Sequence, residues 1–374
     1  MTDKLFTPLQ LGPYTLQHRV VLAPLTRMRA DPDGHVPTAL NAAYYAQRAT
    51  PGGLLITEAT PVSWQGHGHP CVPGIHTAAQ VQGWRRVTDA VHARGGLIFM
   101  QLWHTGRVSH SSHQPGGAAP VGPSAVAAQG RTIDAHWQPV PYEVPRALEA
   151  AEMAPLVDTW AAAAANAVAA GFDGVEVHGA NGYLLEQFLQ SRSNRRTDAY
   201  GGSIANRCRL VLEVVDAVVA AVGRDRTGIR LSPWGVANDS GEDEPLPLYR
   251  HLVGELALRE LAYLHLIEPR ASGAGKADLV REGQPSAAAV FRPLWPTVLI
   301  DAGGFDRAGA IDAVACGHAD AVAFGRWFIA NPDLPHRLRV GAPLNPYHRP
   351  TFYGGGAAGY TDYPALASTA GAPA

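Results

Sequence analysis

The stretch Asp173–Leu189, DGVEVHGANGYLLEQFL, changes character twice along its length. It opens as a short branched apolar run, presents His178, Asn181 and Tyr183 in close order around two glycines, and closes as an apolar stripe. The opening run predicts a buried strand and the closing stripe predicts a helix. A strand that ends in an imidazole, an amide and a phenol just before a helix indicates a functional site in a parallel α/β protein.

Similar apolar runs alternate with alanine-rich segments along most of the chain. Eight buried-type strands on one chain of this length favour a closed (β/α)₈ TIM barrel. A doubly wound open sheet is the alternative, but no GxGxxG motif follows the first strand. The predicted strands are Val20–Pro24, Gly53–Glu58, Gly96–Leu102, Asp173–His178, Gly228–Ser232, Ala262–Ile267, Thr297–Asp301 and Asp320–Gly325. The predicted helices are Thr38–Arg48, Ala78–Arg94, Ala147–Ala170, Ser203–Val222, Pro247–Glu260 and Asp306–Cys316, with a weak one within Lys276–Val290 and a last one near Asn331–Val340.

We expect residues 1–365 to form a single domain, because no change in composition marks a boundary. Residues 111–145 are rich in Pro, Gly and Ala and far exceed the ~2–6 residues typical of a strand-to-helix loop. This segment predicts a lid or cap over the barrel mouth, with an inert surface excursion as the alternative. We expect the residues before Val20 to form a small plug at the other end of the barrel. We expect residues 366–374 to form a frayed tail.

The composition excludes several classes of function. With 374 residues, 46% hydrophobic, 17% charged and a formal net charge of -2, the chain has an ordinary soluble composition and no electrostatic case for nucleic acid. No apolar run reaches the ~18 residues of a membrane span, and the amino terminus has no signal pattern. Cys71, Cys208 and Cys316 make no CxxC pair or iron–sulfur spacing. We expect a cytoplasmic protein.

The other predicted strands also end in polar side chains. Gln101 offers a planar amide that suits the NH–CO edge of a uracil-like ring. Arg230 stays cationic and could stabilise an anionic ring, and Thr26 can donate to a carbonyl oxygen. Each residue alone has a structural explanation: a turn cap, a backbone partner or a buried ion pair. Their joint placement at successive strand ends favours a bound ring.

Glycines follow the seventh and eighth strands. Gly303 and Gly304 precede Asp306, which begins a helix, and Gly325 precedes Arg326. Glycines let backbone N–H groups approach an anion, and barrels of this type often bind phosphate at these two loops. Taken alone, the glycine pair is explained equally well by a tight turn. A phosphate, a pyrimidine edge and a nearby cation together match flavin mononucleotide, FMN.

The opening stretch then suggests the reaction. His178 and Asn181 are neutral donors that could converge on one oxygen, and Tyr183 is a weak acid that stays protonated at neutral pH. Hydride on one face of a carbon and a proton on the other is the reduction of an activated alkene. The structural alternative is a core histidine, a turn at Asn181 and a packed Tyr183.

Longer motifs carry a resemblance to a known family. APLTRMRA (23–30), QLWHTGR (101–107), HGANGYLLEQFLQSRSNRRTDAYGG (178–202), GIRLSP (228–233), DAVAFGRWFIANPDL (320–334) and FYGGGAAGYTDYP (352–364) resemble the Old Yellow Enzyme family. The nearest subgroup resembles the bacterial N-ethylmaleimide, pentaerythritol tetranitrate and xenobiotic reductases. The resemblance implies an FMN-bearing barrel that takes hydride from NAD(P)H, with NADPH preferred by family habit, and gives it to electron-poor alkenes.

The resemblance also implies roles for individual residues. His178 and Asn181 would anchor the substrate carbonyl or nitro group, and Tyr183 would protonate the carbon. Trp103, Tyr353 and His69 would line the pocket above the flavin. The residues implied to contact isoalloxazine and ribityl are Pro24, Thr26, Ala59, Gln101 and Arg230, and those implied to hold the phosphate are Gly303, Gly304, Gly325 and Arg326.

Some positions depart from the family pattern. Asn181 stands where several relatives have a second histidine, and His69 where many have a tyrosine. His67 and His69 form an HxH pair, for which metal binding is a poor interpretation. Trp234 and the acidic loop NDSGEDE (238–244) have no assigned role. Glu58 is interpreted as a structural carboxylate, and His104 is given no chemistry.

The sequence leaves four functions to compare. The first is an ene-reductase acting on small electrophilic alkenes, as a monomer or homodimer. The second is reduction of nitrate esters or nitroaromatics at the same flavin. The third is a metal-dependent barrel hydrolase, which lacks a bridging carboxylate pattern and leaves Gln101 unexplained. The fourth is a non-catalytic barrel that binds a phosphorylated ligand.

Overall fold

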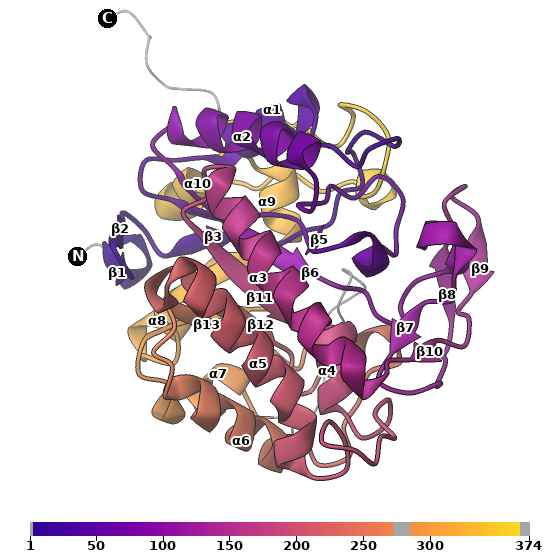
Figure 1. Cartoon of the computed structure of the whole chain (residues 1–374). Coiled ribbons are helices and arrows are strands. Elements are labelled where there is room, and N and C mark those ends of the chain that lie inside the picture. The colour runs from indigo at the N-terminus through magenta and orange to yellow at the C-terminus, as the bar shows by residue number, and fades with distance from the viewer. Residues whose placement is uncertain (1–2, 272–284, 367–374) are drawn as a thin grey trace, which may run out of the picture.

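A computed structural model of the chain describes residues 3–271 and 285–366. Within these residues, eight parallel strands form a closed barrel, which confirms the predicted fold (Figure 1). Each barrel strand pairs with the next along the chain, and the last pairs with the first. The barrel strands are β3 (Val20–Leu22), β4 (Leu54–Ile56), β6 (Leu97–Trp103), β11 (Gly174–Gly179), β12 (Thr227–Leu231), β13 (Tyr263–Ile267), β14 (Val298–Ala302) and β15 (Ala321–Phe324), and β5 (Thr60–Pro61) adds a short pairing to β6.

Alternation along each strand divides side chains between the barrel interior and the surrounding helices. On β11, Val175 and Val177 belong to the large apolar cluster under the helices. Glu176 points inward, because it bonds to His265 on β13, a strand that is not its neighbour. The inward row of β11 therefore carries polar side chains.

The amino-terminal end of the barrel interior is apolar. A hairpin of β1 (Leu9–Leu11) and β2 (Tyr14–Leu16) precedes the first barrel strand. Its buried Leu11 and Leu16 share one apolar cluster with Phe99 and Tyr263 from the barrel interior. The hairpin therefore closes this end of the barrel.

Helices cover the outside of the barrel between successive strands (Figure 1). None of the helices in residues 3–271 and 285–366 has the length and apolar character needed to cross a membrane. The helices are α1 (Ala39–Arg48), α2 (Ala78–His92), α3 (Met153–Ala169), α4 (Leu184–Leu189), α5 (Ile204–Val222), α6 (Pro245–Ala257), α7 (Ala287–Phe291), α8 (Arg307–Ala315), α9 (Arg326–Ala330) and α10 (Leu334–Val340).

Several predicted helix boundaries were wrong. Helix α3 begins at Met153 rather than Ala147, because Arg146–Ala147 forms β10, which pairs with β7 (Val121–Gly122). Helix α9 was not predicted, and α10 begins at Leu334 rather than Asn331. Most of the weak helix predicted within 276–290 lies outside the described residues, as does nearly all of the predicted frayed tail.

The long segment 111–145 carries a hairpin of β8 (Arg131–Ile133) and β9 (Pro139–Pro141), which projects beside the barrel (Figure 1). Its end contacts the loop that follows β12, since the Tyr142 hydroxyl donates to Asn238 Oδ1 at 3.4 Å. We call residues 111–145 the cap segment. Its action as a lid stays a prediction.

Candidate functional site

Four buried polar side chains meet inside the barrel at the carboxyl ends of β6, β11, β12 and β13. Gln101 lies opposite Glu176 in the strand register, and Arg230 lies opposite His265. Glu176 accepts from Gln101 Nε2 at 2.7 Å and is 2.8 Å from His265 Nδ1. The strand register brings Gln101 and Arg230, two of the predicted ring-binding residues, into one layer.

The polar and charged groups of this layer shift the pKa values of one another. Burial opposes the ionisation of Glu176, but His265, Arg230 and Gln101 outweigh it and lower the pKa of the carboxyl. Burial lowers the pKa of the Arg230 guanidinium, and the Glu176 carboxylate opposes that shift. The Arg230 Nε atom has no hydrogen-bond partner within residues 3–271 and 285–366. A buried cation with an unpaired donor can stabilise an anionic ring placed over it.

His178 lies one strand period beyond Glu176 and opposite Arg230 in the strand register, and its ring contacts Tyr183. Their ring centroids are 5.2 Å apart, and the Tyr183 ring meets Trp103 edge-on at 4.8 Å. Burial, with Arg230 next, holds the pKa of His178 well below its usual value, so the imidazole is neutral at pH 7. Burial also raises the pKa of Tyr183, which keeps the phenol protonated. The neutral imidazole of His178 and the protonated phenol of Tyr183 therefore lie side by side.

Asn181 is held by its backbone. Its φ of 59° is in the left-handed region, its N–H donates to Ser232 Oγ at 2.9 Å, and its carbonyl accepts from Asn238 Nδ2 at 2.9 Å. Asparagine tolerates this backbone conformation better than most residues. The contacts fix the turn that carries Asn181 from both sides.

Tyr353 reaches the site from the far end of the sequence. The backbone N–H of Gly354 donates to the Arg27 carbonyl at 3.0 Å, and Arg27 Nε donates to the Phe352 carbonyl at 2.8 Å. The pKa of Tyr183 responds to the charge of Tyr353. The buried Arg27 after β3 thus fastens the predicted pocket tyrosine to the barrel.

The remaining predicted ring contacts follow β3 and β4, which are neighbours in the barrel. Pro24 is buried and Thr26 is half-buried after β3. Ala59 packs in one apolar cluster with Trp103, against Tyr183. These positions surround the same mouth of the barrel.

The predicted phosphate loops also lie side by side, because Ala302 pairs with Ala323 at the ends of β14 and β15. Gly303 has a φ of 117°, and an added Cβ would lie 2.9 Å from the Ala271 methyl. Gly304 also has a positive φ. Gly325 directly precedes helix α9, and Arg326 is the first residue of that helix. The turn requires glycine at Gly303 whether or not a phosphate binds.

The histidines of the HxH pair do not point to one place. His67 Nε2 is 3.1 Å from His76 Nε2, whereas His69 stacks on Trp103 at 5.8 Å. In the described part of the chain, no group of three or more His, Cys, Asp or Glu side chains could hold a metal ion. Burial lowers the pKa of His69 to about 4, so it is neutral. His69 thus packs on Trp103, another of the predicted pocket residues, and its role in the pocket stays a prediction.

Two other strand-end residues make local contacts. Glu58 accepts from the Arg27 backbone N–H at 3.1 Å and the Tyr45 hydroxyl at 3.5 Å. His104 Nδ1 accepts from the Gly106 N–H at 3.0 Å. The contacts of both residues connect a strand end to neighbouring backbone or to a helix.

Three polar residues at or beside the site were not predicted: Glu176, His265 and Asn238. Glu176 was detectable, because it precedes His178 by one strand period and so faces the same side. His265, a polar residue within the apolar run AYLHLI, carried a similar signal. Nothing in the acidic loop indicated that Asn238 would reach the site.

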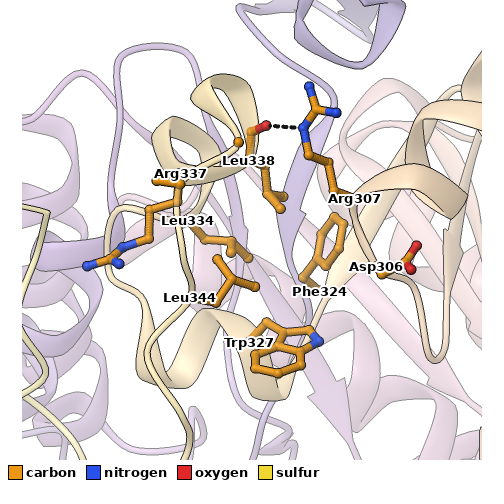
Figure 2. Close-up of a pocket in the computed structure, with 10 residues that line it drawn as sticks. Asp306, Arg307, Phe324, Trp327, Leu334, Arg337, Leu338 and Leu344 are labelled. Atoms are coloured by element: carbon orange, nitrogen blue, oxygen red, sulfur yellow. Dashed lines mark hydrogen bonds between the residues drawn. The ribbon is translucent and has the colours of Figure 1, made fainter.

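A different pocket, of about 150 Å³, lies outside the barrel between the start of α8 and α10 (Figure 2). Its wall includes Phe324, Trp327 and Leu334, and Arg307 Nε donates to the Leu338 carbonyl at 2.6 Å across its edge. The pocket contains none of the predicted site residues.

Known proteins share both the sequence and the fold. Residues 4–345 match the NADH:flavin oxidoreductase / NADH oxidase family. The chain is 47% identical over 373 residues to 12-oxophytodienoate reductase 2 of Arabidopsis thaliana, covering 98% of this chain and 96% of the relative. A solved structure of morphinone reductase in complex with tetrahydroNAD has a TM-score of 0.91 at 47% identity and covers 99% of each chain.

The Old Yellow Enzyme homologue of Zymomonas mobilis has a TM-score of 0.91 at 42% identity, covering 97% of this chain and 99% of that structure. The bacterial subgroup stays a prediction. The chain belongs to the NADH:flavin oxidoreductase / NADH oxidase family and is an NAD(P)H-dependent flavin oxidoreductase of the Old Yellow Enzyme type.

Proposed function

We propose that the protein is an ene-reductase that reduces activated alkenes such as α,β-unsaturated carbonyls, maleimides and nitroalkenes. The main support is the contact between His178 and Tyr183, with the neutral His178 opposite the buried Arg230 in the strand register. Relatives named for 12-oxophytodienoate and morphinone reduction are consistent with this substrate class.

The buried donors fit an FMN ring. Arg230 and Gln101, with Pro24, Thr26 and Ala59, would hold the isoalloxazine and ribityl. The phosphate would be held by Gly303, Gly304, Gly325 and Arg326. When bound, FMN takes hydride from NAD(P)H and passes it to the β-carbon of the alkene. We also propose that the enzyme prefers NADPH over NADH.

The chain's own residues would bind the substrate and move the proton. His178, neutral at pH 7, and Asn181 would donate to the carbonyl or nitro oxygen and polarise the alkene. Tyr183 would then give its hydroxyl proton to the α-carbon. Trp103, His69 and Tyr353 would form the pocket that keeps water from the reacting carbon.

Tyr183→Phe tests this assignment. Because a general acid contributes about 10²-fold or more, reoxidation of the reduced enzyme by 2-cyclohexenone should slow about 100-fold. Reduction by NADPH should stay within about twofold, since that half-reaction needs no proton from Tyr183. Tyr200→Phe, a phenol bonded to Glu213 on the outer helices, is the matched control. Equal loss in both half-reactions would refute Tyr183 as the proton donor.

A further inference from the structure

A buried carboxyl that the proposed reaction does not use contacts the turn that carries Asn181. Glu186, on α4, is fully buried. It accepts hydrogen bonds from the Gly182 backbone N–H, from the Ser232 hydroxyl at 2.6 Å and from the Tyr249 hydroxyl at 2.7 Å. These three donors are neutral, and they come from the turn after β11, the end of β12 and α6. One buried carboxyl therefore joins three elements at the turn.

The Ser232 hydroxyl connects this carboxyl to the backbone of Asn181. Ser232 Oγ accepts from the Asn181 N–H at 2.9 Å and donates to Glu186 Oε1 at 2.6 Å. A hydroxyl has one proton to donate and two lone pairs that accept. Because Ser232 gives its proton to the carboxyl, its lone pairs are left for the Asn181 N–H. The acceptor at Glu186 thus sets the direction of the bond that holds Asn181.

The two peptide groups of Gly182 are held by adjacent residues of α4. The Gly182 N–H donates to Glu186 Oε2, and the Gly182 carbonyl accepts from Gln187 Nε2 at 2.8 Å. Gly182 has a φ of 76°, a conformation that glycine adopts without strain. The backbone that joins Asn181 to Tyr183 is therefore fixed on both of its polar sides.

The chemistry of a carboxylate suits this task. Burial raises the pKa of Glu186 to about 7, and the bonds from Ser232, Tyr249 and Gly182 act in the opposite direction. A carboxyl whose ionisation is opposed by burial adds little stability in its charged form. Its two oxygens have about four lone-pair directions, so it can accept from all three donors at once. What it supplies is a fixed direction for each donor.

We propose that Glu186 is a positioning residue for substrate binding, which acts through Ser232 and Gly182 to aim the Asn181 amide at the substrate oxygen. The same contacts hold Asn181 and Tyr183 in one relative position, so the anchored oxygen and the proton donor stay in register. The inference rests on the proposed function of Asn181 as an anchor for the carbonyl or nitro oxygen.

Two variants remove the contacts at different points. Glu186→Leu keeps a similar volume and accepts no hydrogen bond, so the Gly182 N–H and the Ser232 hydroxyl lose their acceptor. Ser232→Ala removes the connecting hydroxyl alone and leaves the Gly182 N–H bonded to Glu186. Ser232→Ala decides the question by itself if Glu186→Leu does not fold.

The matched control is Glu213→Leu, the same substitution on α5. Glu213 accepts from the Tyr200 hydroxyl at 3.1 Å and, within residues 3–271 and 285–366, makes no hydrogen bond to residues 181–183. Each variant is made in the wild-type and Asn181→Gly backgrounds, because glycine keeps the positive φ of Asn181 and removes its amide.

The measurement is anaerobic stopped-flow on the flavin-loaded enzyme, which is reduced with NADPH and then mixed with 2-cyclohexenone. The dependence of the reoxidation rate on enone concentration gives the enone affinity and the limiting rate separately. A variant that is only less stable keeps the wild-type affinity in its folded fraction, whereas a variant with a displaced anchor does not.

We expect Glu186→Leu to weaken enone affinity about tenfold, the value of the one hydrogen bond that a displaced Asn181 loses. Ser232→Ala should weaken it about threefold, because Gly182 keeps its acceptor. In the Asn181→Gly background both losses should fall below about twofold, since the residues act as one unit. Glu213→Leu should stay within about twofold of wild type in both backgrounds.

Two results would overturn the positioning role. One is wild-type affinity in Ser232→Ala and in folded Glu186→Leu, and the other is a loss that persists undiminished in the Asn181→Gly background. Unchanged affinity in Asn181→Gly alone would instead overturn the anchoring role of Asn181 in the proposed function. The cycle therefore separates failure of the inference from failure of the proposal on which it rests.

Discussion

The two ends of the barrel interior are built from the same strands and differ completely in character. On β6, Phe99 faces an apolar cluster with the amino-terminal hairpin, and Gln101, one strand period later, bonds to a buried carboxylate. On β13, Tyr263 and His265 repeat this change. A single strand period therefore separates the end that stabilises the barrel from the end that is proposed to carry the chemistry.

The polar end stays stable because its buried charges satisfy one another. Glu176 has partners in Gln101 and His265 and an attractive neighbour in Arg230. Burying any one of these groups alone would cost several kcal/mol. The comparison predicts that changes at the apolar end affect stability alone, whereas changes at the polar end affect ligands and rates.

Phe99→Ala should have the largest effect on stability. The side chain is fully buried, and a Phe→Ala cavity costs about 3–5 kcal/mol in the free energy of unfolding. Urea unfolding measures this loss. The rates of both half-reactions in the folded variant should stay within about twofold of wild type. A large loss of enone reduction by folded protein would break the proposed division.

Glu58 is the exception to this division, because its carboxyl makes structural contacts, and Glu58→Gln tests its effect on stability. Burial raises the pKa of Glu58 from 4.5 to about 7. Because the folded pKa lies above the unfolded value, the stability it contributes is complete below about pH 4.5 and is lost as pH rises toward 7. At 1.36 kcal/mol per pKa unit, the loss is about 3 kcal/mol.

The measurement is the free energy of unfolding of wild type and Glu58→Gln at several values between pH 4.5 and 8. The wild type should lose about 3 kcal/mol relative to the variant over this range, because glutamine does not titrate. A difference that is constant with pH would contradict the raised pKa of Glu58.

His178→Ala should give the smallest of these energetic effects, a loss of ligand affinity together with slower reduction of the enone. Loss of one donor to a ligand oxygen should weaken phenol or enone binding about tenfold, measured by titration of the flavin absorbance. His92→Ala, which removes a histidine bonded to Asp173 on the outer surface, is the matched control. Unchanged affinity in His178→Ala would exclude its anchoring role.

Much of the fold could be predicted because it depends on local patterns. Eight short apolar runs that alternate with helical segments indicate a barrel, and strand ends locate the mouth. Helix α3 was predicted too long because β10 depends on pairing with Val121, which no local pattern reveals. Helix α9 was missed because its few apolar residues follow directly from a strand.

The candidate site was predicted where its residues end strands, as at Gln101, His178 and Arg230. The Glu176–His265 pair spans non-neighbouring strands, so its formation depends on barrel closure and register. Asn238 reaches the Asn181 carbonyl through a left-handed loop whose conformation is set by tertiary contacts. Contacts of this kind leave no periodic trace in the sequence.

The most direct test of ene-reductase function is a visible spectrum of the purified protein, followed anaerobically with NADPH and then 2-cyclohexenone. The account predicts a flavin band that bleaches with NADPH and returns with the enone. Reoxidation by oxygen or a nitrate ester but not by the enone would contradict the proposed substrate class. No flavin band after reconstitution with FMN would contradict the cofactor assignment of the polar end.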